Sequence, residues 1–549
     1  MHRRRYGLIV LVLGVLLTLG GLLADFLGAG GGGNLGPRQV LALLAGTGLA
    51  VAGIVLLRRP PEWRRPFASL GQREVVALLI LGGIAALVYL VHLGTATWHP
   101  DELEYARAGR QYLAGDFDSN LEHPFLGKYV LGAAQALFGR ETVLGVRGPG
   151  ILAGLLTGAV LFAFGCRSAG FWAGFAAFAL WALVEHPAGN APIKLERFGL
   201  LDVFMGLFAA GALYAGWRWI TTRDWRWVIA TGVLAGLATG SKAPGVLVLV
   251  PLIFGGLFAL GLSRNSLLQA ATLLATCAVA ALATYLPTIA DAPDQIRYMF
   301  EFQSARTGHP VVVRGNVYDE PPWWANLWAQ WEYLGPVSTV CLAALAVGAG
   351  WLLQVRLFVY LILAVLAPFV YLSFFSAFAL THYYYAWLPP LTLLAALCIH
   401  ALYERRGRLR IVGVIATVPL AVVAGGTVLD VASLKPRDYP VAAEVLRDAG
   451  LDRGSVVVIG YDGVLHAYLP KLRLAKVPGS GTDAIVTDRI VARRARLRTG
   501  SFLGNPRAVA RHLEGHRDEY ELRTVDRLDV YVRRASLRRP RHPSWDRRG

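Results

Sequence analysis

Runs of about 20 consecutive apolar residues recur along the chain, and they constrain its fold more than any other feature of the sequence. A helix of that length spans roughly 30 Å, the thickness of the hydrocarbon core of a bilayer. The chain is 55% hydrophobic and only 16% charged, which departs from the composition of soluble proteins. The sequence therefore predicts a polytopic α-helical membrane protein.

Thirteen apolar segments are candidate transmembrane helices. The first follows a basic start, "MHRRRYG", that resembles a signal peptide, but no small-residue cleavage site follows and we expect this helix to be retained. The expected helices are approximately 6–27, 38–57, 75–95, 147–165, 169–186, 199–219, 226–240, 244–262, 266–290, 335–353, 357–377, 383–402 and 411–430.

Short basic turns orient these helices, because Lys and Arg favour cytoplasmic loops. One assignment places every short basic turn inside, with the N-terminus cytoplasmic and the C-terminus extracytoplasmic. The turns are "HRRR" at the start, 58–66, Arg167, 218–226, Arg264, Arg356 and 404–410. The net charge of +18 is thus explained by topology and anionic lipid rather than by nucleic acid.

Three regions follow from this topology. Residues 1–74 hold two transmembrane helices and a basic cytoplasmic loop; 75–430 form the main transmembrane domain, with outer loops at 96–146 and 291–334. Residues 431–549 read as a small extracytoplasmic α/β domain with a basic tail, since "YPVAAEVLRDAG" has the pattern of an amphipathic helix and "GSVVVIGYDG" that of a strand and turn. The four cysteines are far apart and are expected to be unpaired thiols.

The first outer loop opens with adjacent carboxylates, Asp101 and Glu102, in "WHPDELEYA". The spacing of "ELEYARAGRQYLAG" predicts an amphipathic helix, and "GKYVLGAAQALFG" predicts a second. Between them, "EHPFLGK" forms an irregular turn that carries charged residues, as interfacial loops often do.

Two charged residues interrupt apolar sequence further on. Asp202 lies at the start of an apolar helix in "RFGLLDVFMGLF", where it either faces a polar cavity or simply complements the helix dipole. Lys242, in "GLATGSKAPG", either lies in such a cavity or extends its ammonium to the membrane surface.

The second outer loop and a later helix start complete the candidates. "FEFQSARTGHP" offers Arg306 and His309, and "THYYYAWLPPL" begins a helix with aromatic residues that would also suit an ordinary interfacial belt. One face therefore gathers carboxylates suited to general-base work and cations suited to a phosphate. No Gly-rich nucleotide cradle is present, so a membrane-borne phosphate donor such as a polyprenyl-phosphate sugar is indicated.

The order of these pieces resembles the GT-C glycosyltransferases of the protein O-mannosyltransferase and aminoarabinose transferase family. The similar elements, across roughly residues 75–430, are "DELEYARAGRQYLAGDF", "EHPFLGKY", "RFGLLDVFMGLF", "GLATGSKAPGVLVL" and "THYYYAWLPPL". Phe125 stands where the family has a second proline. The loop at 291–334 lacks the large insertion of many mannosyltransferases, so a bacterial member is the better match.

The resemblance implies roles for individual residues. Asp101 would be the base for the acceptor hydroxyl, Glu102 its paired neighbour and Asp202 a second acid near the site. The donor phosphate would contact Lys242, Lys128, His123 and Arg306, and the substrate pocket would include Tyr105, Glu122, His309, His382 and Tyr383.

The implied reaction is a direct displacement with inversion, moving a mannose- or arabinose-type sugar from a polyprenyl-phosphate donor to a protein, glycan or lipid acceptor. It requires no metal or other cofactor, although Glu122–His123 or Glu185–His186 could hold an ion. Two other classes were weighed: a multi-spanning transporter or lipid flippase, which would predict internal repeats and charges near mid-membrane, and a scaffold in which Asp101 and Glu102 are ordinary loop charges.

Overall fold

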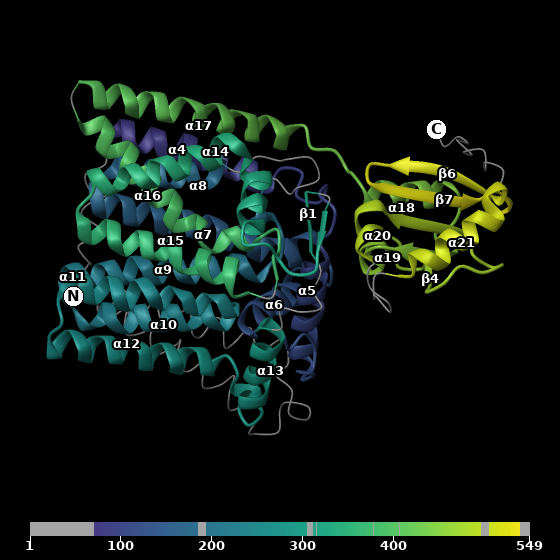
Figure 1. Ribbon diagram of the computed structural model, residues 1–549, viewed down its shortest axis with the longest axis horizontal. Helices are drawn as coiled ribbons and strands as arrows, with labels where there is room; N and C mark the ends of the chain where they lie inside the picture. The colour runs from purple at the N-terminus through teal and green to yellow at the C-terminus, as the bar shows by residue number, and fades with distance from the viewer. Residues whose placement is uncertain are drawn as a thin grey trace, which may run out of the picture. The chain divides into compact units, whose positions relative to one another are not determined.

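The computed structural model describes residues 71–184, 194–304, 311–314, 316–376, 378–405, 407–495 and 504–537 (Figure 1). Its described residues form two compact units. A helical unit comprises those of 71–93, 104–304 and 322–432, and a second unit comprises those of 94–103, 311–321 and 433–537. The two predicted N-terminal helices, 6–27 and 38–57, lie outside the described residues.

The helical unit consists mainly of long apolar helices, and every span predicted from 75–95 onward lies on a helix. Eight helices within the described ranges are long and apolar enough to cross a membrane, so the chain is a multi-pass membrane protein, while the count of thirteen stays a prediction. The eight are α4 (Gln72–Leu90), α7 (Val143–Ala169), α9 (Leu201–Thr222), the run Ala243–Leu260, α12 (Arg264–Ala283), α14 (Ala325–Leu352), α15 (Val355–Phe374) and α17 (Arg408–Ala432).

Shorter elements complete this unit. The run Ala243–Leu260 is irregular: it begins as a 3₁₀ helix, contains a π turn and ends as α11. The further elements are α8 (Phe171–Leu183), α10 (Trp225–Ser241), η2 (Ala243–Val248), η3 (Pro251–Gly255), α11 (Gly256–Leu260), η4 (Leu286–Thr288), α13 (Ala292–Ser304), η5 (Tyr383–Ala386) and α16 (Leu388–Glu404).

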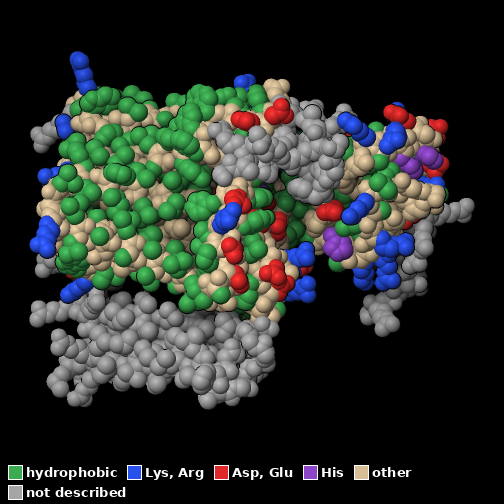
Figure 2. Space-filling model, turned by 60° about the horizontal axis from the view of Figure 1, so that its bottom comes forward, with side chains coloured by type: hydrophobic (Ala, Val, Ile, Leu, Met, Phe, Trp, Pro, Cys, Tyr) green, Lys and Arg blue, Asp and Glu red, His purple; other side chains and the backbone are tan. Residues whose placement is uncertain are grey.

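Short turns make successive long helices run back and forth, as Figure 1 shows. The α9–α10 turn at Arg223, the α11–α12 turn before Arg264 and the α14–α15 turn before Arg356 therefore lie at one end of the unit. On the face seen in Figure 2, an apolar band separates Lys and Arg side chains at that end from acidic side chains near the other. This distribution is the one that the positive-inside pattern predicts.

The loop predicted at 291–334 is more structured than the sequence analysis expected. Its residues include α13 and two short antiparallel strands, β1 (Val311–Val313) and β2 (Asn316–Tyr318). Helix α14 also begins at Ala325, ten residues before the predicted start at 335. Gly335, with a φ of 76°, and Pro336 kink this helix near the predicted start.

The two amphipathic helices predicted in the first loop are confirmed as α5 (Pro100–Leu113) and α6 (Leu126–Phe138). They cross at Gly109 and Gly132, where a Cβ on either residue would collide with the backbone of the other helix. A short segment, η1 (Leu195–Arg197), precedes α9 and is held by Arg197, which donates hydrogen bonds to the carbonyls of Val88 and Val91.

The second unit contains a five-stranded mixed sheet in the order β4-β3-β5-β7-β6. The first three strands are parallel and the last two antiparallel. The strand predicted at 454–463 and the helix predicted at 439–450 are confirmed as β3 and α18. The elements are α18 (Tyr439–Asp448), β3 (Ser455–Ile459), α19 (Asp462–Tyr468), β4 (Arg473–Ala475), β5 (Ala484–Asp488), α20 (Arg489–Ala495), α21 (Pro506–His516), η6 (Arg517–Glu519), β6 (Tyr520–Val525), β7 (Leu528–Arg533) and η7 (Arg534–Ser536).

The side chains of strand β3 are buried on both faces of the sheet. Val456 and Val458 point to a core formed with α18 and α19, whereas Val457 and Ile459 point to a second core beside α21. A parallel strand buried on both sides reads as a continuous apolar run, as "VVVI" does here.

Candidate active site

Three charged or ionisable side chains meet inside the helical unit. The Lys242 ammonium lies 2.7 Å from Oδ2 of Asp202, and Nε2 of His382 lies 3.3 Å from Lys242 Nζ and 3.5 Å from Asp202 Oδ2. All three are at most 2% exposed. All three are residues that the sequence predicts for the site, and the structure brings them together from positions up to 180 residues apart.

Helix ends position this triad. Asp202 is in the first turn of α9, Lys242 follows the last residue of α10 in extended conformation, and His382 precedes η5. Because the helices alternate in direction, these three ends lie opposite the basic turns. Helix ends leave backbone groups without intrahelical partners, which makes them natural places for polar side chains within an apolar bundle.

Tyr383 belongs to the same cluster, since Lys242 Nζ lies 5.0 Å from the centre of its ring. An aromatic face attracts a cation more strongly where both are removed from water. The aromatic start of the α16 segment therefore does more than line a membrane interface: Tyr383 is buried against the ammonium.

The loop between α5 and α6 contributes His123. Its ring packs edge-on against Tyr105, with ring centres 5.4 Å apart. Burial lowers the pKa of His123 well below 6.5, and the nearby charges of Lys242, Lys128 and His382 lower it further. His123 is therefore neutral, and within the described chain its buried Nδ1 has no hydrogen-bond partner.

Lys128 holds this loop rather than facing an open space. Its ammonium donates hydrogen bonds to the carbonyls of Asn120, at 2.5 Å, and His123, at 2.8 Å. Its side chain is fully buried, and burial lowers its pKa to about 7. Asn120 in turn donates to the carboxylates of Glu104 and Glu122, so Glu122 fixes the turn. Through these bonds, Lys128 and Glu122 stabilise the conformation of the loop.

Asp101 and Glu102 belong to the segment of the second unit that begins α5. Glu102 is fully buried, and its carboxylate accepts a hydrogen bond from the backbone of His99 at 2.7 Å. In return, Nδ1 of His99 accepts from the backbone of Asp101 at 3.2 Å. This reciprocal pattern is a capping box with histidine in the cap position. It leaves the Asp101 carboxylate, with 31% of its side chain exposed, as the outward-facing member of the pair.

The capping role of His99 is a feature that the sequence analysis missed. Its signal was present, because a polar residue followed by proline and, three residues on, by glutamate is typical of a helix start. Arg306 and His309 lie outside the described residues, as do Glu185 and His186.

An apolar pocket begins one helical turn away from the triad. It is lined by continuations of the same three elements: Met205 and Gly206 on α9, Pro244 and Gly245 after Lys242, and Pro389 and Pro390 on α16. Every residue around it is apolar or glycine. The helical unit thus places a buried cation beside an apolar recess, a combination that suits an amphipathic anion.

One family model matches part of the chain. Residues 122–290 match the family model PMT_2, dolichyl-phosphate-mannose-protein mannosyltransferase. No curated protein matches the chain.

Solved structures of ArnT share the fold. ArnT from Cupriavidus metallidurans bound to undecaprenyl phosphate is 14% identical, with a TM-score of 0.52 over 85% of this chain and 99% of its own. Its apo form gives 14% identity and a TM-score of 0.51 over the same shares. The archaeal oligosaccharyltransferase AglB from Archaeoglobus fulgidus is 11% identical, with a TM-score of 0.46 over 77% of this chain and 71% of its own. Residues 122–290 thus match the PMT_2 family model, and the described chain has an ArnT-like fold.

Proposed function

We propose that this enzyme transfers a mannose- or arabinose-type sugar from a polyprenyl-phosphate donor to an acceptor hydroxyl at the extracytoplasmic face of the membrane. The observation that carries the proposal is the buried Asp202–Lys242–His382 triad beside the apolar pocket. A buried ion pair contributes little net stability because desolvation offsets the attraction, so its presence in an apolar bundle favours a functional role.

Lys242 is the proposed contact of the donor phosphate. Its ammonium lies between the Asp202 carboxylate and the face of Tyr383, and both hold it in place. The first isoprene units of the donor would occupy the pocket lined by Met205, Pro244 and Pro389. The structure of ArnT, which shares this fold, was solved bound to undecaprenyl phosphate, a polyprenyl phosphate of the class that would leave in the proposed reaction. His123 and His382 would complete the head-group contacts, with Arg306 and His309 as further candidates.

Asp101 is the proposed base. It would take the proton of the acceptor hydroxyl, and the acceptor oxygen would attack the anomeric carbon as the bond to the phosphate oxygen breaks. The electron pair of that bond leaves with polyprenyl phosphate, whose added negative charge Lys242 would stabilise. One displacement inverts the anomeric configuration. Glu102 supports Asp101 through the helix cap, and the scheme uses no metal.

Sidedness rests on the basic turns. Because the helices alternate in direction, Arg223, Arg264 and Arg356 lie at the end opposite the triad, and this end is proposed to be cytoplasmic. The N-terminus would then be cytoplasmic and the domain from 431 extracytoplasmic. The proposed regions remain 1–74, 75–430 and 431–549.

The test uses purified protein in nanodiscs, given polyprenyl-phosphate mannose or arabinose labelled in the sugar, together with membranes as acceptor. Label should pass to an acceptor fraction, and Lys242→Ala should weaken donor binding while the exposed-lysine control Lys471→Ala does not. If no donor of this class is consumed and the protein instead carries solute or lipid across vesicles, the transporter or flippase is the correct function.

A further inference from the structure

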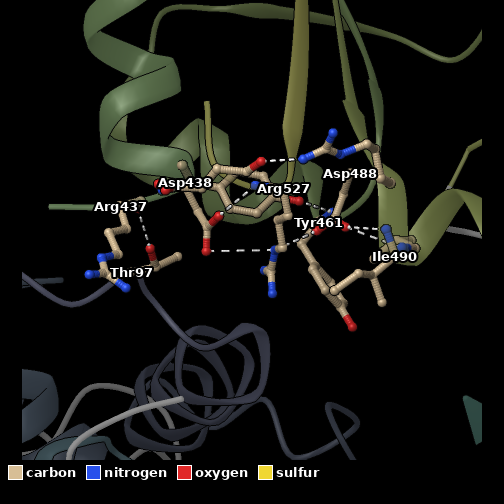
Figure 3. Close-up of polar contacts among 11 residues, drawn as sticks. Thr97, Arg437, Asp438, Tyr461, Asp488, Ile490 and Arg527 are labelled. Atoms are coloured by element: carbon tan, nitrogen blue, oxygen red, sulfur yellow. Dashed lines mark hydrogen bonds and ion pairs between the residues drawn. The ribbon is translucent and has the colours of Figure 1, made fainter. Parts of the chain in front are cut away.

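Two hydrogen bonds tie the segment before α5 to the sheet domain of the second unit. Thr97 Oγ1 donates to the carbonyl of Arg437 at 2.8 Å, as Figure 3 shows, and the backbone of Trp98 donates to the hydroxyl of Tyr468 at 3.2 Å. Arg437 lies just before α18, and Tyr468 is the last residue of α19. The partners are therefore some 340 and 370 residues away in sequence.

Apolar packing reinforces these bonds. The side chains of Trp98 and Leu103 pack against the core that α18 and α19 form with β3. These two residues flank the capping box of His99, Asp101 and Glu102. The whole first turn of α5 is thus held at both ends by the sheet domain.

The carbonyl of Arg437, which accepts the hydrogen bond from Thr97, lies next to a buried ionic network (Figure 3). Asp438, the residue after Arg437, has a φ of 58° and ψ of −119°, a strained backbone for a residue other than glycine. Its amide donates to Asp526 at 3.0 Å, and its carboxylate lies 3.6 Å from Arg527. Arg527 also lies 3.1 Å from the buried carboxylate of Asp488.

This network joins three separate parts of the domain. Asp488 ends β5, where it also caps α20 by accepting from Ile490 at 3.0 Å, and Arg527 stands in the β6–β7 turn. Burial raises the pKa of Asp438, while the two acids raise the pKa of Arg527. A rotation of the strained Asp438 backbone would move the carbonyl that Thr97 contacts. Arg527 therefore links the residue beside that carbonyl to β5 and to the β6–β7 turn.

We infer that the C-terminal sheet domain is a positioning element for Asp101, acting through Thr97, Trp98 and Tyr468. This inference rests on the proposed function, in which Asp101 is the base. Thr97 is four residues before Asp101, and the cap residue His99 lies between them. A displacement of a reacting group by about 1 Å is enough to reduce a rate roughly 100-fold, so loss of these bonds should lower turnover without changing the donor site.

The experiment compares the double variant Thr97→Val/Tyr468→Phe with wild type in nanodiscs. Both substitutions keep shape and remove one hydrogen-bonding group each. Turnover should fall roughly 10- to 100-fold, with donor affinity unchanged within twofold, and amide hydrogen exchange over residues 97–104 should accelerate. The single variant Thr97→Ser should retain the wild-type rate, because serine keeps the hydroxyl that donates the hydrogen bond to Arg437. Thr524→Val/Tyr531→Phe is the matched control in the same domain.

Unchanged turnover or unchanged exchange at 97–104 in the double variant would overturn the inference, and so would an equal loss in the Thr524/Tyr531 control. The exchange measurement needs no sugar donor. If wild type fails to use any polyprenyl-phosphate sugar, the proposed function fails, while the exchange result still decides whether the domain holds this segment.

Discussion

Lys242 and Asp202 form an ion pair of 2.7 Å in which both side chains are only 2% exposed. They come from the end of one helix and the start of another, 40 residues apart. A pair so deeply buried is expensive to desolvate, and hydrophobic residues of similar volume often serve a core as well or better. Because the pair lies beside an apolar pocket, its position favours a role in function over a role in stability.

Removing either partner should destabilise the protein, because the other charge then stays buried without compensation. Asp202→Asn and Lys242→Gln are each expected to cost about 3–5 kcal/mol, whereas the combined variant should cost less than the sum of the two. Melting temperatures in detergent measure this. The exposed pair Arg297–Glu301 is the control, and Arg297→Gln should change the melting temperature little. Additive losses in the double variant would contradict the coupling.

The sequence predicted the members of this site better than their arrangement. Asp202 and Lys242 stand out because each interrupts an apolar run, and His382 stands out only through its aromatic neighbours. Their meeting depends on how three helix ends pack, which no local pattern records. The long helices were predictable for the opposite reason, since an apolar length near 20 residues is a local property.

Lys128 shows how much of a site residue's surroundings the sequence leaves open. A lysine in a loop motif suggests a phosphate ligand, but its ammonium donates to two loop carbonyls. Asn120, which supplies one of these carbonyls, has a positive φ of 56°, a backbone conformation that the sequence does not reveal. Similarly, the sequence predicts Glu102 as the paired neighbour of Asp101 in the site, and does not predict that its carboxylate accepts from the backbone of His99 at the helix cap.

The adjacent carboxylates Asp101 and Glu102 should therefore respond differently to substitution. Asp101→Asn should lower turnover by roughly 10²–10⁴-fold, the range of general-base catalysis, with donor binding and stability retained. Glu102→Gln keeps an oxygen for the cap and should remain stable, while Glu102→Ala should lose about 1 kcal/mol. Turnover assays and melting temperatures on all three separate the roles. Normal turnover in Asp101→Asn would remove Asp101 as the base.

The buried ammonium of Lys128 should give stability an unusual pH dependence. Its folded pKa of about 7 lies below the ordinary 10.5, mainly because of burial. Between these values the unfolded chain holds a proton that the folded protein lacks, so stability rises with pH across this window. The contribution of Lys128 to stability is therefore lowest below pH 7. The melting temperature of wild type relative to Lys128→Met should therefore increase from pH 7 to 10. A constant or falling difference would be inconsistent with the lowered pKa.

The crossing of α5 and α6 should tolerate no side chain larger than hydrogen. A Cβ at Gly132 would meet the backbone carbonyl of Gly109 inside contact distance, and backbone cannot rotate aside as a side chain can. Gly132→Ala should therefore separate the two helices and cost at least 1–3 kcal/mol, the usual range for overpacking. Gly83→Ala on α4 is the matched control, since nothing lies within 4 Å of a Cβ there, and alanine favours a helix by roughly 1 kcal/mol over glycine. The two melting temperatures should move in opposite directions. Equal shifts would contradict the close backbone contact of α5 and α6 at Gly132.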